Sequence, residues 1–436
     1  MFYNDYGYME IKNFDKLART SLREAALRIA EAGLQAIDTK AVIHKAVKIG
    51  GNTLHFQGEE VLLDGIGDIT VIGVGKCALD AGEALEEILG DRLQGGVVVD
   101  VRSGAVTGKM KKIQGTHPLP SEQNVEAART IVKLLEGRRK KDLVIFIISG
   151  GGSTFLCLPD ERGCFEEMVV VKTLIRKGAT IQEINTVRKH LSLARGGYLA
   201  KYAYPACVVS LIFSDVVGDD LGFIASGPTV KDQSTVKDAE AVLEKYDVLR
   251  TCGIEQCGLV ETPKDNRYFE RVNNILLVTN GTALNAMKAR TNELGFQGRI
   301  STACLSGEAS EAGLAIARDL HSVPSKTVLL YGGETTVTVR GEGRGGRNLE
   351  LGLSALREIR AGELVVSVAS DGRDNGEFAG AVCDSLTRKA VEENGTDIET
   401  VLKNNDEYPL FETVGNYIFT GDTGSNVSDL VIAMKE

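Results

Sequence analysis

Short apolar runs that end at a glycine and lead into a helix recur along this chain and limit the folds open to it. In the first half they span residues 69–74, 96–99, 143–148 and 207–213. Continuous apolar strands that alternate with helices are what a parallel sheet covered on both faces requires. With 49 glycines and only 8 prolines in 436 residues, tight strand-to-helix turns are favoured over extended linkers. The pattern predicts an α/β protein.

A second series of apolar runs follows the polar, irregular segment 250–272. An amphipathic helix over 14–37 and a hairpin over 47–63 precede the first series. We therefore expect two three-layer α/β/α domains, 1–250 and 251–436, the first with a Rossmann-like, mostly parallel sheet. The strands expected in the second domain are 275–278, 327–331, 335–339 and 364–368.

The formal net charge of −10 argues against a nucleic-acid partner, because phosphate backbones are bound by basic surfaces. No apolar run reaches the length that spans a bilayer, and the N-terminal residues lack the charged-then-apolar order of a signal peptide. We expect a cytoplasmic protein with no membrane partner. Isolated basic residues can still hold a small anionic substrate, and a homodimer is left open.

Ligands of such sheets bind beyond the carboxyl ends of the strands. The loop Gly73–Ala78 reads GVGKCA and fits the dinucleotide pattern G-x-G-x-x-[GA], with Asp100 at the end of the next strand. Taken alone, this loop favours an NAD-type site. Lys76, however, is a cation at a helix N-terminus, and an anion shared with the helix amides would offset that unfavourable position. We interpret Lys76 as part of an anion site.

A second loop reads SGGGST and directly follows the buried run LVIFII. Its three glycines let backbone N–H groups close on a phosphate or carboxylate, and two hydroxyls flank them. This pattern is typical of an anion cradle. The residues expected to hold the anion are Ser149, Gly150, Gly151, Gly152 and Ser153.

A basic helix within 185–197 ends in ARGG. Glycine after the last turn is ordinary C-capping, and a cation there is favourable without any ligand. For Arg195, capping and substrate contact are therefore equally open. Arg188, Lys189 and His190 are expected to form a solvated face.

Glycine and arginine come together in the second half of the chain. Gly332, Gly333 and Glu334 follow a strand, and the stretch 341–348 reads GEGRGGRN before a helix. Loop glycine lets a phosphate approach closely, and Arg347 offers a bidentate fork for it. A flexible surface hairpin is the alternative.

Carboxylates follow three of the apolar runs. Asp215 comes after 207–213, and the loops 370–375 and 420–426 add further aspartates, hydroxyls and glycines. Mg²⁺ prefers one or two carboxylates with water and phosphate oxygens. Glycine cradles, isolated cations and strand-end aspartates together indicate phosphoryl transfer, which needs positioning and charge neutralisation. Hydride transfer would use only the first loop and leaves the others unexplained.

At these residues the sequence resembles the glycerate 2-kinases of the MOFRL type over nearly the whole chain. The similarity rests on GVGKCA, THPLPSEQN, SGGGST, NTVRKHLS, ARGG, SDVVGDD, ASGPT, GGET, GRNLE, SDGRD and TGDTGSNVSDL. It implies an active site in the cleft between two α/β domains, ATP and Mg²⁺ as cosubstrates, and D-glycerate converted to 2-phosphoglycerate. Asp422 and the run DGRDNGE depart from the usual family residues.

The resemblance also suggests roles for particular residues. It implies that Lys76 and Arg347 are the critical cations. Our own hypothesis adds Asp215 as a metal ligand or base, and Arg195 as a substrate contact together with the SGGGS loop. Asp371 is the second expected metal ligand. Residues expected to bind the nucleotide are Gly332, Gly333, Glu334, Asn348, Asp371, Thr420, Gly421, Thr423 and Asn426. Two alternatives stay open: an NAD-dependent hydroxypyruvate reductase, and a non-catalytic sugar-phosphate-binding regulator.

Overall fold

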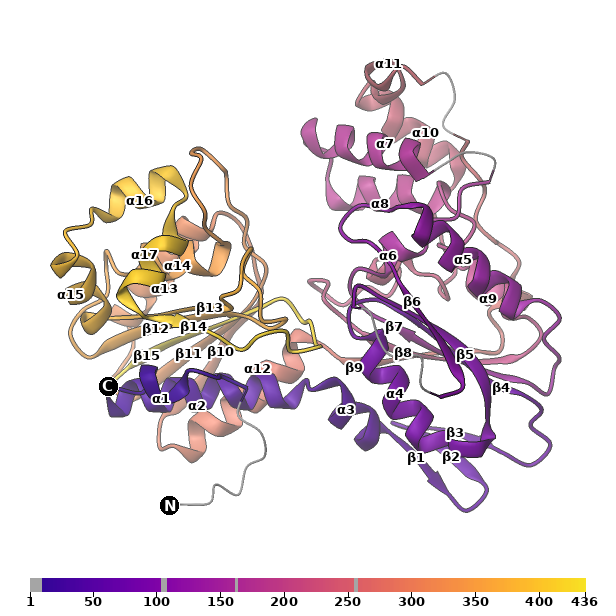
Figure 1. The fold of residues 1–436 in the computed structure, drawn as a ribbon, viewed down its shortest axis with the longest axis horizontal. Coiled ribbons are helices and arrows are strands. Elements are labelled where there is room, and N and C mark those ends of the chain that lie inside the picture. The colour runs from indigo at the N-terminus through magenta and orange to yellow at the C-terminus, as the bar shows by residue number, and fades with distance from the viewer. Residues whose placement is uncertain (1–9, 103–107, 161–163, 255–257) are drawn as a thin grey trace. The chain divides into compact units, whose positions relative to one another are not determined.

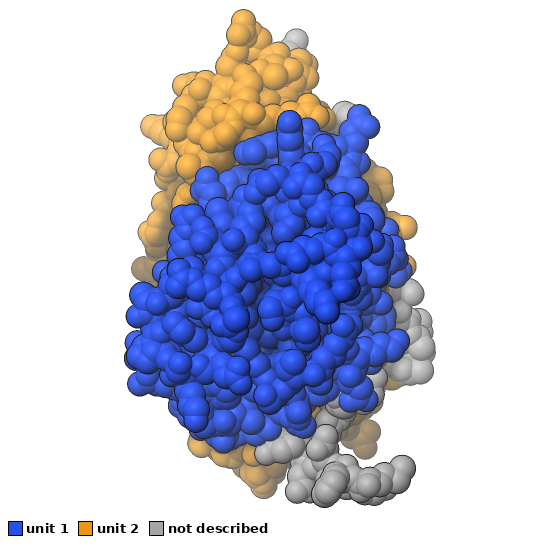
Figure 2. All heavy atoms as spheres, turned by 90° about the vertical axis from the view of Figure 1, so that its left-hand side faces the viewer, with its two compact units in different colours: residues 1–38, 278–436 blue, residues 39–277 orange. Residues whose placement is uncertain are grey.

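The computed structural model describes residues 10–102, 108–160, 164–254 and 258–436. The chain forms two compact units, coloured separately in Figure 2. Unit 1 contains residues 1–38 and 278–436, and unit 2 contains residues 39–277. The chain thus passes from one unit to the other at 38/39 and again at 277/278, whereas the sequence suggested one boundary at 250/251.

Unit 2 is built on a six-stranded parallel sheet in the order β6-β5-β4-β7-β8-β9 (Figure 1). Every residue of the central strands β4 and β7 is buried, which explains why both are uninterrupted apolar runs. A separate antiparallel sheet, β1-β2-β3, extends the expected hairpin by one strand. The strands are β1 (Val47–Gly50), β2 (Thr53–Phe56), β3 (Glu59–Leu62), β4 (Ile69–Val74), β5 (Leu93–Asp100), β6 (Met110–Gln114), β7 (Leu143–Ile148), β8 (Cys207–Phe213) and β9 (Val272–Val278).

Helices cover both faces of this sheet, and a small helical lobe follows. Helix α4 packs on β4 and β5 from one side, while α5 and α9 bury apolar side chains against the other. Helices α7, α8, α10 and α11 share an apolar core of their own. The helices are α3 (Thr39–Ala46), α4 (Ala78–Leu89), α5 (Glu122–Leu135), α6 (Gly152–Phe155), α7 (Cys164–Arg176), α8 (Ile181–His190), α9 (Tyr198–Ala203), α10 (Val236–Lys245) and α11 (Val248–Cys252).

Unit 1 contains a six-stranded mixed sheet in the order β10-β11-β15-β12-β13-β14. Among the described strands of this unit, β10 and β11 form the one parallel pair, and the C-terminal strand β15 inserts between β11 and β12 and runs antiparallel to both. The strands are β10 (Gln297–Leu305), β11 (Thr327–Gly333), β12 (Glu363–Ala369), β13 (Gly380–Asp384), β14 (Tyr417–Ile418) and β15 (Asp429–Lys435).

The mixed sheet also lies between two helical layers (Figure 1). Helices α2 and α12 pack together against one face, and α13 and α14 bury their apolar sides against the other. The helices are α1 (Phe14–Leu17), α2 (Ser21–Ala36), α12 (Asn280–Glu293), α13 (Ala309–His321), α14 (Arg347–Ala355), α15 (Ser385–Glu393), α16 (Ile398–Asn404) and α17 (Glu407–Val414).

A buried ion pair explains why helix α2 belongs to unit 1. The side chain of Arg23 in α2 is fully buried, and its guanidinium donates to both carboxylate oxygens of Asp384 at 2.6 and 2.7 Å. The same guanidinium donates to Asn416 and Thr387. A buried arginine is tolerated only when its donors are paired in this way.

Two expected strands differ from the structure. Residues 275–278 do not open the second sheet but form the end of β9, at the edge of the first. Residues 335–339 form no strand, and only an isolated bridge joins Glu308 to Thr336. The cause is Gly333, whose φ of +141° turns the chain away from the sheet. A side chain there would overlap the carbonyl of Leu305, so glycine is required.

Candidate active site

Two glycine loops of unit 2 are joined directly to each other. The Lys76 amide donates to the Gly150 carbonyl (2.9 Å), and the Cys77 amide donates to Oγ of Ser149 (3.3 Å). Gly75 has a φ of +125°, and a side chain there would overlap Ser149. The two loops follow the adjacent parallel strands β4 and β7, which end at the same edge of the sheet. The expected anion cradle and the lysine are therefore neighbours.

Three chemically active side chains surround the SGGGS loop. A Cβ atom on Gly151 would lie 3.2 Å from the imidazole of His117 and 3.5 Å from Cγ of Lys76. A side chain on Gly150 would overlap the carboxylate of Asp215. Lys76 and Asp215 are half-buried and His117 is exposed. The structure thus brings Lys76, Asp215 and the loop together, and it adds His117, which the THPLP motif could have indicated.

Two residues with strained backbone, Ala225 and Ser226, contribute to holding the same loop in position. Ala225 and Ser226 have φ values of +50° and +60°, which side-chain-bearing residues adopt only at a cost. This conformation places Oγ of Ser226 2.7 Å from Oγ of Ser153 and lets it donate to Oδ1 of Asn185 at 2.8 Å. Residues of the ASGPT and NTVRKHLS motifs therefore hold the position of Ser153.

Two arginines lie behind the loop, and they differ in exposure. Arg195 is fully buried, donating to the carbonyls of Ser153 (2.8 Å) and Arg188 (2.9 Å) and pairing with Glu167 at 2.8 Å. Because ligand cannot reach a covered guanidinium, this placement favours a role for Arg195 in holding the loop. Arg188 keeps 22 % of its side chain exposed, and its guanidinium lies 3.4 Å from Oγ1 of Thr154.

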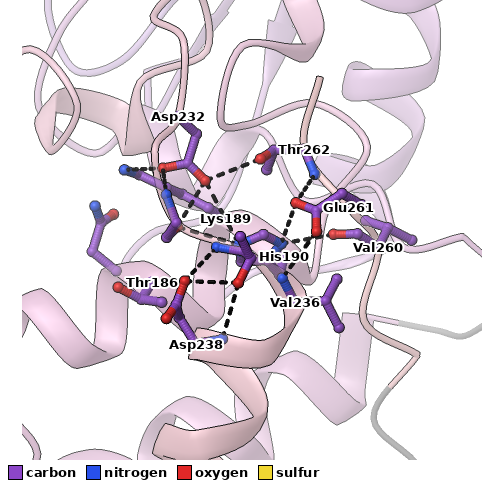
Figure 3. A network of polar contacts seen from close by, with 12 residues as sticks. Thr186, Lys189, His190, Asp232, Val236, Asp238, Val260, Glu261 and Thr262 are labelled. Carbon is purple, nitrogen blue, oxygen red and sulfur yellow. Dashed lines mark hydrogen bonds and ion pairs between the residues drawn. The ribbon is translucent and has the colours of Figure 1, made fainter. Parts of the chain in front are cut away.

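The expectation that Lys189 and His190 are solvated is wrong. His190 is fully buried, and its Nδ1 lies 2.8 Å from the Val260 carbonyl while its Nε2 lies 3.6 Å from Asp232 (Figure 3). Lys189 donates to the same aspartate at 3.0 Å. Burial alone would raise the pKa of Asp232, but Lys189 and the hydrogen bonds from Ser234 lower it. This network attaches the helical lobe to the segment after α11, as Figure 3 shows.

Asp100, on which the dinucleotide interpretation depends, is already engaged. Its side chain is buried, and it accepts from the Leu79 amide at 3.1 Å and pairs with the Arg102 guanidinium at 3.1 Å. In dinucleotide sites the equivalent carboxylate instead accepts from the ribose hydroxyls. Asp100 therefore caps α4, and this contact does not favour an NAD site.

In unit 1, Arg347 is held between two carboxylates at the start of α14. Its Nε and Nη2 donate to Asp429 at 2.5 and 3.1 Å, and its Nη1 pairs with Glu334 at 2.8 Å. These partners raise the pKa of Arg347 although burial opposes them. Burial raises the pKa of Asp429 to about 7, against the effect of Arg347. About 30 % of the Arg347 side chain stays exposed, so an anionic ligand can reach it.

Asn348 connects Asp429 to a second buried carboxylate, Asp374. Asp374 accepts from the backbone amides of Asn348 (3.1 Å) and Leu349 (2.8 Å) and so caps α14. Nδ2 of Asn348 donates to Asp429 at 2.9 Å, and its Oδ1 accepts from Ser367. Asn348 is expected to bind nucleotide, and both polar ends of its side chain have protein partners in the structure. Asp374 belongs to the 370–375 loop that the sequence indicated, whereas Asp429 was not proposed from the sequence as a site residue.

The glycines before Arg347 allow close packing as well as ligand approach. Side chains on Gly341, Gly343 and Gly345 would overlap the backbone of Asn404, the side chain of Asp406 and the carboxylate of Glu407 respectively. The glycine loop lies against residues 404–407, and a hollow of about 460 Å³ remains beside it. The hollow's lining includes Glu334, Val337, Gly346, Arg347, Asp374 and Glu407. The flexible-hairpin alternative does not fit a loop packed this closely.

The remaining expected nucleotide residues also belong to unit 1. The Thr423 hydroxyl donates to the Ser370 carbonyl at 2.6 Å, and a side chain on Gly372 would overlap the Gly421 carbonyl. These contacts join the loops that contain Asp371, Thr420, Gly421 and Thr423. The carboxylate of Asp371 accepts from the Arg373 amide (3.1 Å), and the side-chain amide oxygen Oδ1 of Asn426 accepts from the Ser428 amide (3.1 Å). Gly332, which lies two residues before Glu334, packs against the side chain of Asn280, and a side chain at Gly332 would overlap it.

The donors needed for Mg²⁺ are present only in part. Among the described residues, no group of three or more His, Cys, Asp or Glu side chains could hold a metal ion alone. Mg²⁺ bound with phosphate needs only one or two carboxylates, and Asp215 faces the glycine loop, where a side chain on Gly150 would occupy the space. The residues present therefore fit a metal that arrives with a nucleotide. No helix in the described ranges is long and apolar enough to cross a bilayer.

Comparison with known proteins gives consistent matches over both units. A family model described as a domain of unknown function, DUF4147, matches residues 25–257, and the MOFRL family model matches residues 327–429. A glycerate 2-kinase of Pyrococcus horikoshii is 38% identical over 95% of this chain and 97% of its own length. A D-glycerate 2-kinase of Thermotoga maritima is 38% identical over 84% and 90%.

A relative with a different name and a solved structure complete the comparison. A protein of Agrobacterium vitis named putative hydroxypyruvate reductase is 37% identical, covering 84% of this chain and 86% of the relative. The crystal structure of a glycerate kinase from Thermotoga maritima superposes with a TM-score of 0.81 at 33% identity, covering 95% of this chain and all of that one. The α/β architecture with one parallel and one mixed sheet is thus common to this chain and a solved relative.

Proposed function

Because this chain belongs to the family of glycerate 2-kinases that combine DUF4147 and MOFRL domains, we propose that it transfers the γ-phosphoryl group of ATP to the C2 hydroxyl of D-glycerate. The products are 2-phosphoglycerate and ADP. The observation that supports this most directly is the joined pair of loops in unit 2, which places Lys76 beside an anion cradle of three glycines. Phosphoryl transfer depends on such positioning and charge neutralisation rather than on a covalent nucleophile.

Lys76 neutralises charge that develops on the transferring phosphoryl group. The hydrogen bond from the Lys76 amide to the Gly150 carbonyl fixes the backbone of Lys76 beside the loop. The side chain that carries the ammonium group therefore extends from a fixed position. The amides of the Ser149–Ser153 loop orient substrate oxygens. Asp215, adjacent to Gly150, serves either as a metal ligand or as the base that accepts the proton of the C2 hydroxyl.

Arg347 supplies a second cation from unit 1. Its pairing with Asp429 and Glu334 fixes the plane of the guanidinium before ligand arrives. A preorganised charge stabilises a transition state without reorganisation during the reaction. We propose that Lys76 of unit 2 and Arg347 of unit 1 act on the same phosphoryl group.

ATP and Mg²⁺ are the proposed cosubstrates, and the metal when bound neutralises phosphate charge. Asp215 and Asp371 are the proposed metal ligands. Gly332, Gly333, Glu334, Asn348 and the 420–426 loop are the proposed nucleotide residues. A cytoplasmic location is part of the same proposal, since ATP is supplied there.

Product analysis tests the proposed function. The purified chain is incubated with ATP, Mg²⁺ and D-glycerate, and the products are identified by phosphorus NMR. We expect the resonance of 2-phosphoglycerate and an equal amount of ADP, with no ADP formed in the absence of glycerate. A 3-phosphoglycerate resonance would refute the C2 assignment, and ADP formation that is independent of glycerate would refute the kinase.

The reductase is the second candidate, and the name of the Agrobacterium vitis relative favours it. The contacts of Asp100 oppose it, because that carboxylate already holds the Leu79 amide and Arg102. The two candidates differ in cofactor. The assay adds hydroxypyruvate to the protein with NADH or NADPH and monitors the absorbance of the nicotinamide band. A fall in that absorbance would support the reductase, and we expect no fall.

A further inference from the structure

The helix α8 presents one basic side chain beside the glycine loop that the proposed mechanism does not use. The guanidinium of Arg188 lies 3.4 Å from Oγ1 of Thr154, the residue that follows Ser153 in the SGGGST motif. That hydroxyl also donates to the carbonyl of Pro118, the neighbour of His117. Arg188 is therefore anchored to the rim of the same loop that Lys76 and His117 adjoin.

Positive charge exceeds negative charge at this point of the described structure. Arg188 and Arg195 share a single carboxylate, Glu167, at 3.7 and 2.8 Å. Nε of Arg188 and Nη2 of Arg195 are buried, and neither has a hydrogen-bond partner among the described residues. Two guanidinium groups with one carboxylate leave one positive charge uncompensated, which an incoming anion would balance.

The lowered pKa of Arg188 agrees with an excess of positive charge around it. Burial and the neighbouring Arg195 lower the pKa of Arg188 to about 10, and Glu167 only partly opposes them. An anion placed against the guanidinium would counteract both effects.

Only one of the two arginines can meet a ligand. The Arg195 side chain is completely covered, whereas 22 % of the Arg188 side chain is exposed. The planar guanidinium matches a carboxylate through two parallel hydrogen bonds. We infer that Arg188, rather than Arg195, binds the carboxylate of the acceptor substrate at the rim of the SGGGST loop. This inference rests on the proposed function.

In this arrangement the acceptor is held at its charged end by Arg188, and its hydroxyls face the loop and Lys76. Arg195 and Glu167 hold the loop and the Arg188 side chain in place. A substrate without a carboxylate would lose the contact, so Arg188 determines specificity for a hydroxy acid over a simple polyol.

Replacement of Arg188 by Gln tests the inference. Arg188→Gln retains a polar side chain but lacks the charge, and Arg188→Lys retains the charge but lacks the fork. We expect Arg188→Gln to raise KM for D-glycerate by about 10- to 100-fold, the loss typical of one charge-assisted contact. KM for ATP should change by no more than about twofold. Arg176→Gln, at the exposed end of α7, is the matched control and should leave both constants unchanged.

Two further measurements separate binding from folding. Glycerol lacks the carboxylate, so Arg188→Gln should leave the residual kcat/KM for glycerol unchanged while lowering that for D-glycerate. Without ATP, D-glycerate should raise the melting temperature of the parent protein and of Arg176→Gln but not that of Arg188→Gln. If Arg188→Gln does not fold, Arg188→Lys carries the test, with a smaller rise in KM for D-glycerate.

The possible results are distinguishable. Equal D-glycerate KM and equal stabilisation in parent and Arg188 variants would overturn this inference and leave the kinase intact. A rise confined to KM for ATP would also overturn it, because Arg188 would then serve phosphate. If the parent protein neither binds D-glycerate nor consumes ATP with it, both the inference and the proposed function are wrong.

Discussion

The buried carboxyl of Glu407 gives the sharpest prediction about unit 1. Glu407 opens α17, its side chain is fully buried, and neither carboxyl oxygen has a hydrogen-bond partner in the described structure. Burial raises its pKa from the usual 4.5 to about 8, and the nearby Glu350, Asp374 and Asp406 add to the rise. At neutral pH the folded protein therefore holds a proton that the unfolded chain releases.

The consequence for stability has a definite sign and size. Between pH 4.5 and 8 the folded state binds one more proton than the unfolded state at this residue, so the free energy of unfolding falls as pH rises. The slope for one proton is about 1.4 kcal/mol per pH unit. Between pH 5.5 and 7.5, Glu407 should therefore remove about 2–3 kcal/mol of stability. Glu407→Gln cannot ionise and should lack this loss.

Urea unfolding followed by circular dichroism at pH 5.5 and 7.5 measures the effect. The free energy of unfolding of Glu407→Gln relative to the parent should rise by about 2–3 kcal/mol between the two pH values. Glu412→Gln is the matched control, since Glu412 is exposed on the same helix and should show no such change. Parallel pH profiles for Glu407→Gln and the parent would refute the argument that this carboxyl is neutral in the fold.

Three other substitutions and one chelation experiment test the proposed site. Lys76→Ala should lower turnover by about 10³-fold with little change in melting temperature, since removed transition-state charge is the main loss; unimpaired turnover would exclude Lys76. Arg347→Ala should destabilise unit 1 by about 3–5 kcal/mol, because Asp429 is left buried without its partner, and adding Asp429→Asn should recover part of this loss in urea unfolding. Gly75→Ala should abolish activity, because its φ of +125° and its contact with Ser149 exclude a side chain; a fully active variant would contradict the described loop. EDTA should stop turnover and excess Mg²⁺ should restore it, and turnover unaffected by EDTA would remove the metal from the proposal.

Much of the fold and part of the site could be predicted from local patterns. The strands over 69–74 and 143–148 are continuous apolar runs, and their loops contain the glycines that a close approach requires. Strand order explains why the loops around Lys76 and Ser149 meet, because adjacent parallel strands end at one edge. The sequence predicted an anion-binding role for each loop separately, and the hydrogen bonds between them show that the two loops are neighbours.

Other features depend on contacts that sequence spacing does not reveal. Thr335–Val339 has the alternation of a strand, but Gly333 turns it away from the sheet and leaves it without a strand partner. His190 belongs to a helix of charged residues, and only the packing of Asp232 and Val260 buries it. The same limit applies to Asp374 and Asp429, whose roles arise from side chains that are distant in sequence.

The placement of α2 in unit 1 has a consequence for the order in which the molecule assembles during translation. Residues 39–277 form a continuous stretch, so unit 2 can fold as soon as it leaves the ribosome. Unit 1 cannot, because β15, which ends at Lys435, lies between β11 and β12 in its sheet. Helix α2, which is synthesised before unit 2, must therefore stay without its sheet until β15 emerges, and its apolar face is exposed to chaperones throughout that interval.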